Sequence, residues 1–117
     1  MSSTPLKLNL GEGSVSFNFS PQGAQELKGA LDELMARLKN VAAKTTPGSG
    51  KVAPQAPVEY RYTGEVFLEI FCNPNIWATP FAAKVLLTVR DVNIRLTTEA
   101  ELTRVIEDVN QYLEQVG

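Results

Sequence analysis

Residues 15–41 have the sequence VSFNFSPQGAQELKGALDELMARLKNV, in which an alternating segment runs directly into a periodic one. Its first five residues alternate between apolar and polar, which is typical of a half-buried strand. Ser20 and Pro21 then supply a capping hydroxyl and a proline at the first helical position. The apolar residues that follow recur every three or four positions, as on one face of a helix of about 22 residues: Ala24, Leu27, Leu31, Leu34, Leu38 and Val41. We therefore expect a strand followed by a capped amphipathic helix.

Upstream of this segment, Leu6, Leu8 and Leu10 alternate with polar residues, and turn-forming residues fill positions 11–14. Residues 6–19 therefore predict a β-hairpin with one apolar face. Within the helix, Gly29 lowers the helix propensity, so either this weakening is tolerated or a neighbour packs closely there.

Residues 58–72 alternate without a change of phase. Most even-numbered positions are apolar, and Gly64 interrupts the series. A turn at Thr63–Gly64 would make a hairpin, whereas a glycine inside a strand also leaves the phase unchanged. We expect one long bent strand, ended by the turn-forming triplet Asn73–Asn75.

Residues 85–96 also alternate, but their phase changes at Arg90–Asp91, which predicts a tight turn or a bulge. Thr98 and Glu101 have the spacing of a capping box and predict the start of a second helix. Its expected buried stripe contains Leu102, Val105, Ile106, Val109, Leu113 and Val116, with Tyr112 at the edge and Glu107, Asp108, Glu114 and Gln115 on the solvent side.

These elements predict an α+β fold, a two-layer sandwich in which one antiparallel β-sheet is covered on one face by two amphipathic helices. The order β-β-α occurs twice and suggests an internal repeat, which either a duplication or shared physics would explain. Residues 45–57 contain three prolines and two glycines, so we expect a flexible linker inside a single domain of residues 1–117.

Composition narrows the function classes. Of 117 residues, 44% are hydrophobic and 21% are charged, the balance of a soluble globular protein. The chain has no His and one Cys, which argues against histidine-dependent catalysis, a disulfide and a cysteine-pair metal site. No secretory signal or membrane-length apolar run is apparent, so we expect a cytoplasmic protein without membrane insertion.

The charge distribution argues against nucleic-acid binding. Residues 1–57 carry six basic and four acidic side chains, and residues 58–117 carry five basic and nine acidic ones. Neither half contains the dense basic stripe that displaces counterions from a phosphate backbone.

The residues that could act in catalysis are better explained as core or solvent-exposed residues. Cys72 shares its face of the predicted strand with Leu68 and Ile70, where a cysteine acts as a small hydrophobe. The carboxylates at positions 65, 69, 107 and 108 are expected in solvent, which does not raise a carboxyl pKa. We assign no catalytic residue, no metal site and no cofactor.

The loop of residues 73–81 is the candidate partner-binding site. Its two prolines restrict a segment that carries three large apolar side chains. Stiff aromatic anchors lose little entropy on docking, so we assign partner binding to Asn75, Ile76, Trp77 and Phe81. Alternatively, Trp77 and Phe81 fold back and close one end of the core.

The sequence therefore favours a small non-catalytic protein-interaction module or accessory subunit with an unidentified protein partner. The alternative is a small-ligand-binding protein or a carboxylate-based enzyme that uses Tyr60, Arg61 or Tyr62. A homo-oligomer is a third hypothesis, because the leucine series of the first helix is nearly a heptad pattern.

Overall fold

The computed structural model describes residues 4–43 and 54–116. In chain order the elements are β1 (Pro5–Asn9), β2 (Ser14–Asn18), α1 (Pro21–Ala43), β3 (Val58–Thr63), β4 (Phe67–Cys72), the 3-10 turns η1 (Pro74–Ile76) and η2 (Pro80–Ala82), β5 (Lys84–Arg90), β6 (Arg95–Glu101) and α2 (Leu102–Val116). The predicted α+β class is confirmed. Most of the predicted linker, residues 45–53, lies outside the described residues.

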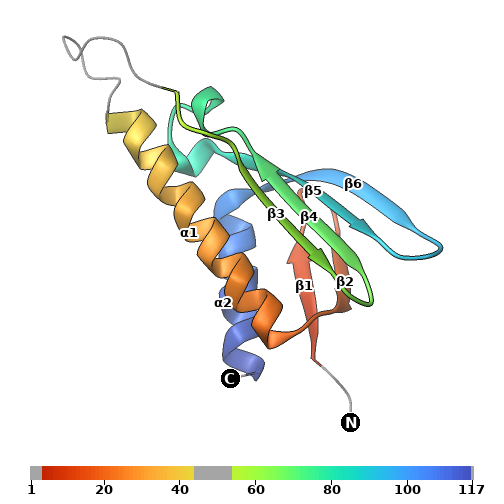
Figure 1. Cartoon of the computed structure of the whole chain (residues 1–117). Coiled ribbons are helices and arrows are strands. Elements are labelled where there is room, and N and C mark those ends of the chain that lie inside the picture. The colour runs from red at the N-terminus through yellow and green to blue at the C-terminus, as the bar shows by residue number, and fades with distance from the viewer. Residues whose placement is uncertain (1–3, 44–53, 117) are drawn as a thin grey trace.

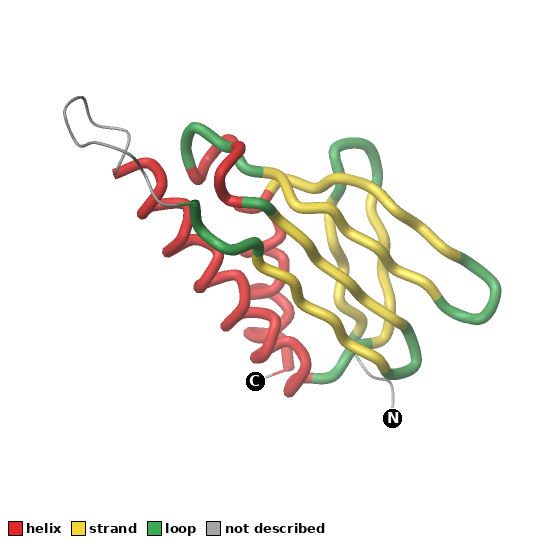
Figure 2. The backbone as a smooth tube through the Cα atoms, turned by 45° about the horizontal axis from the view of Figure 1, so that its top comes forward, coloured by secondary structure: helices red, strands yellow, loops and turns green. Residues whose placement is uncertain are grey.

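The strands form two antiparallel sheets rather than the single sheet expected. β1 pairs with β2, and the other four strands form a second sheet in the order β3-β4-β5-β6. Both helices and the β1–β2 hairpin lie on the same side of the four-stranded sheet (Figures 1 and 2). Side chains from both sheets and both helices form one hydrophobic cluster between them.

The β1–β2 hairpin forms as predicted. Leu6 and Leu8 are fully buried, so the alternating face points into the core. The turn requires a glycine at position 13, because the backbone there has a φ of 90°. Leu10 N donates a hydrogen bond to Gly13 O across the turn, at 2.9 Å.

Helix α1 also begins as predicted. The Ser20 hydroxyl accepts a hydrogen bond from Gly23 N at 2.9 Å and so caps the first turn. The apolar stripe of the helix is buried in the core, so the leucine series that suggested an oligomer packs within the chain. Gly29 is exposed with no atom within 4 Å of the position a Cβ would take, so no close packing requires this glycine.

The expected long strand over residues 58–72 is instead a hairpin. Thr63 lies opposite Phe67, and Gly64 N donates a hydrogen bond to Val66 O at 3.0 Å. The connection contains three residues, and an odd number returns the chain to the same face of the sheet. The phase of the pattern is therefore the same for a hairpin as for a continuous strand.

The change of phase at Arg90–Asp91 marks a true turn. Asp91 Oδ1 accepts hydrogen bonds from Asn93 N and Ile94 N, both at 2.8 Å, and these bonds lower the pKa of the Asp91 carboxyl. Val92 and Ile94, which were expected in a strand, lie in the turn and are 97% and 67% exposed.

The predicted capping box does not form. Thr98 lies within β6, opposite Leu87, and the strand continues to Glu101 before α2 begins at Leu102. Leu102 N instead donates a hydrogen bond to Ala83 O at 3.0 Å. A backbone carbonyl therefore satisfies the first N–H of α2, which has no partner within the helix.

Both β-β-α units are present, but they are placed differently. The strands of the first, β1 and β2, form their own sheet, whereas β5 and β6 of the second are two strands of the larger sheet. None of the described helices is long and apolar enough to cross a membrane.

Candidate interaction surface

Residues 73–83, which we call the capped loop, connect β4 to β5 through η1 and η2. Asn73 Oδ1 caps η1 by accepting a hydrogen bond from Asn75 N at 3.0 Å, and Thr79 Oγ1 caps η2 by accepting one from Ala82 N at 3.2 Å. A proline begins each turn, where its missing N–H costs no hydrogen bond. The capped loop is therefore held by local bonds as well as by its two prolines.

A second contact ties the capped loop to the segment before β3. Asn75 Oδ1 accepts a hydrogen bond from Gln55 N at 2.8 Å, and Asn75 Nδ2 donates one to Gln55 O at 2.7 Å. The predicted site residue Asn75 thus positions the loop with its amide. Sequence reasoning missed Gln55, because both of its contacts use the backbone and depend on no particular side chain.

The loop's apolar side chains divide into two groups. Trp77 packs against the hydrophobic core, and its buried indole N–H has no regular hydrogen-bond partner. Ile76 is 67% exposed and Phe81 is 83% exposed. Trp77 therefore folds back against the core, whereas Ile76 and Phe81 project from the surface.

Ile76 and Phe81 are two large apolar side chains that the chain leaves exposed on one loop. Burying a large apolar side chain fully contributes about 1.5–3 kcal/mol. The loop that holds Ile76 and Phe81 is already fixed by its caps and by Asn75, so docking would order little additional backbone.

A second exposed surface is the face of the four-stranded sheet that points away from the helices, which we call the outer face. No other described element covers it (Figures 1 and 2). Its apolar side chains are Phe67, Phe71 and Leu86, and Leu86 is 44% exposed. Arg61 forms ion pairs with Glu59 at 2.9 Å and with Glu69 at 2.7 Å on the same face.

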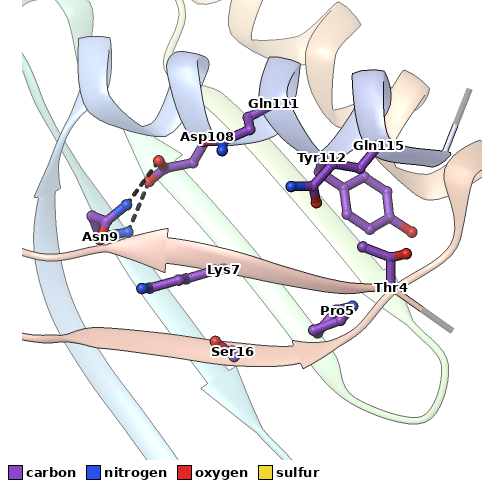
Figure 3. Close-up of a pocket in the computed structure, with 9 residues that line it drawn as sticks. All are labelled: Thr4, Pro5, Lys7, Asn9, Ser16, Asp108, Gln111, Tyr112 and Gln115. Atoms are coloured by element: carbon purple, nitrogen blue, oxygen red, sulfur yellow. Dashed lines mark hydrogen bonds between the residues drawn. The ribbon is translucent and has the colours of Figure 1, made fainter. Parts of the chain in front are cut away.

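The described residues also line a polar groove of about 230 Å³ between the β1–β2 hairpin and α2 (Figure 3). Its one buried charge is Asp108, which was expected in solvent but is only 6% exposed. Asp108 accepts hydrogen bonds from Asn9 N at 2.8 Å and from Asn9 Nδ2 at 2.9 Å. The carboxylate therefore joins α2 to β1.

Position 108 was misassigned because the β1–β2 hairpin packs along α2 and covers a position that an isolated helix would expose. Tyr112, expected at the edge of the stripe, is buried for the same reason and donates a hydrogen bond to Phe19 O at 2.8 Å.

The remaining candidate groups are one thiol and three carboxylates. Cys72 is buried, and burial raises the pKa of its thiol, with the Trp77 indole offsetting part of the rise. Glu65 and Glu107 are exposed, and Glu69 is engaged by Arg61. Within residues 4–43 and 54–116 no three potential ligands group together in a way that could hold a metal ion.

Comparisons with known proteins found no matching family model, no matching curated protein and no matching solved structure.

Proposed function

We propose that this protein is a non-catalytic protein-interaction module or accessory subunit that binds its partner through the capped loop. The observation that carries the proposal is the 83% exposure of Phe81 on a loop fixed by hydrogen bonds. We place it in a reducing compartment such as the cytoplasm, where a lone thiol persists. We treat it as two layers, with the four-stranded sheet as one and the helices and hairpin as the other.

Comparison of matched serine variants in a capture experiment tests this function. The wild-type chain and the variants Phe81→Ser, Ile76→Ser and Val92→Ser are immobilised and exposed to a lysate of the source organism. Val92 is the control, because it is 97% exposed but lies in the β5–β6 turn. We expect one stoichiometric protein on the wild type and on Val92→Ser, and at least tenfold less of it on Phe81→Ser and Ile76→Ser.

The same experiment can reject the proposal. A stoichiometric partner that survives both loop substitutions, or the absence of any such partner, contradicts binding through the capped loop. Trp77 is not substituted here, because its packing against the core would mix a loss of stability with a loss of binding.

The polar groove gives less support to the small-ligand alternative. Asn9 already satisfies the one buried charge, so no unpaired buried group among the described residues that line the groove calls for a ligand. Stabilisation by a metabolite in a thermal-shift screen, abolished by Lys7→Ala at the groove, would favour this alternative.

A further inference from the structure

The outer face is arranged in three rows that cross all four strands. The strand register places Arg61, Glu69, Thr88 and Thr97 side by side in a central row. The row on the capped-loop side contains Glu59, Phe71, Leu86 and Glu99, and the row on the side of the β5–β6 turn contains Thr63, Phe67, Arg90 and Arg95. Each of the four strands therefore contributes one residue to each row.

Charge is segregated between the two flanking rows but balanced over the whole face. The capped-loop row carries the acidic Glu59 and Glu99, and the turn row carries the basic Arg90 and Arg95. Over the whole outer face, including the adjoining Lys84 and Glu101, four basic side chains balance four acidic ones. The basic side chains are Arg61, Lys84, Arg90 and Arg95, and the acidic ones are Glu59, Glu69, Glu99 and Glu101. Two copies of this face therefore carry no net charge that would repel them.

We propose that the outer face binds a second copy of this chain, face to face, about a two-fold axis that follows the central row. Such an axis places the capped-loop row of each copy over the turn row of the other. Glu99 then lies opposite Arg95 of the second copy, and Phe71 lies opposite its Phe67. Every such contact occurs twice, as in any two-fold interface.

The charges favour this axis, which runs between the two sheets and across the strands, over an axis that runs between the sheets and parallel to the strands. An axis parallel to the strands would keep each row over itself and place Glu99 opposite Glu59 of the second copy. Neither Glu99 nor Arg95 forms an ion pair within the described residues, so both can pair between copies.

The size of the face predicts a weak dimer. Four strands about 4.8 Å apart, each about 20 Å long, span roughly 400 Å² per copy. A standard interface buries about 800 Å² per partner. Because the face is about half that size, we expect a weak dimer that is populated only in concentrated solution.

Charge reversal tests the proposed geometry. Sedimentation equilibrium up to about 1 mM protein is measured for the wild type, Glu99→Arg, Arg95→Glu and the double variant, because weak dimers need that range. Each single change places like charges opposite each other at two symmetric positions and should weaken association about tenfold. The double change restores opposite charges across the interface and should return association to within about threefold of the wild type.

Two further variants complete the experiment. Leu86→Ser removes partly exposed apolar surface from the interface and should weaken association without unfolding the chain. Glu107→Arg makes the same charge change at an exposed position of α2, on the opposite side of the sheet, and should leave association unchanged.

Three results would overturn the proposal. The first is a wild-type chain that stays monomeric at about 1 mM, where even a weak dimer should be populated. The second is a double variant that associates no better than the single variants. The third is a chain that stays monomeric but captures another protein from a lysate, where Leu86→Ser abolishes that capture. The captured protein, and not a second copy, would then be the partner that covers the outer face. None of these results bears on Phe81, so the function proposed above is tested separately.

Discussion

At the residue scale, the buried residue Asp108 joins two segments that lie far apart in the sequence. It binds both the backbone N–H and the side-chain amide of Asn9, 99 positions away in sequence. Hydrogen bonds to a charged group contribute about 1.5–3 kcal/mol to the free energy of unfolding. Their loss would leave the two Asn9 donors next to the helix without a partner.

We therefore expect Asp108→Ala to lower the free energy of unfolding by about 2 kcal/mol, measured by urea denaturation. The exposed neighbour Glu107→Ala is the matched control and should change it by less than about 0.5 kcal/mol. Equal effects of the two substitutions would show that the contact with Asn9 contributes nothing to stability.

Tyr60 makes stability depend on pH in the alkaline range. Its hydroxyl donates a hydrogen bond to Gly23 O at 2.9 Å. Burial, followed by the charges of Glu26 and Tyr62, raises the pKa of Tyr60 to about 12 from 10.0. Because the folded chain holds the neutral phenol more tightly than the unfolded chain does, this contribution is complete below pH 10 and declines between about pH 10 and 12.

The measurement is urea denaturation of the wild type and Tyr60→Phe across that pH range. The wild type should lose stability more steeply than the variant, which has no phenol to ionise at this position. Parallel pH profiles would show that Tyr60 is not the group responsible.

At the element scale, the sequence predicted those features that depend only on neighbours along the chain. These include the β1–β2 hairpin, the Ser20 cap and the stripe of α1. It could not separate a continuous strand from the β3–β4 hairpin, because the three-residue turn preserves the phase. It also misplaced the start of α2, since β5 holds Thr98 in a strand by pairing.

In the candidate site, too, the sequence predicted local features but not those that depend on tertiary contacts. The prolines and aromatic residues singled out the capped loop, in which the structure shows two capped 3-10 turns. Which aromatic ring is buried depends on tertiary packing, and the sequence contained no signal that separates Trp77 from Phe81. Asn75 was assigned to partner binding, yet its amide is engaged by Gln55, a contact between segments 20 positions apart.

Two glycines of α1 should respond in opposite ways to the same substitution. A Cβ at Gly23 would come within 2.9 Å of the Tyr62 ring, whereas one at Gly29 would meet nothing within 4 Å. Tyr62 also packs against Phe19, with ring centroids 4.5 Å apart, so a shift of the Tyr62 ring would disturb this contact.

Gly29→Ala should therefore raise the free energy of unfolding by about 0.5–1 kcal/mol through helix propensity alone. Gly23→Ala should lower it by about 1 kcal/mol or more, because overpacking exceeds the gain in propensity. Urea denaturation of both variants measures the difference. An increase in both would mean that Tyr62 yields without cost.

At the scale of the whole molecule, the two sheets and two helices share one core. Leu8 from the hairpin, Leu34 from α1 and Cys72 from β4 all belong to the same buried cluster. A core shared in this way predicts that the hairpin and the four-stranded sheet unfold together as one cooperative unit.

The thiol of Cys72 reports on that cooperativity, because it is 2% exposed and becomes reactive only when its surroundings open. Leu8→Ala and Leu34→Ala should each lower the free energy of unfolding by about 2–5 kcal/mol. If opening is global, each substitution should also accelerate alkylation of Cys72 by the factor that its own loss of stability predicts, about tenfold per 1.4 kcal/mol. Unchanged labelling in Leu8→Ala, together with fast labelling in Leu34→Ala, would instead mean that the hairpin opens independently of the four-stranded sheet.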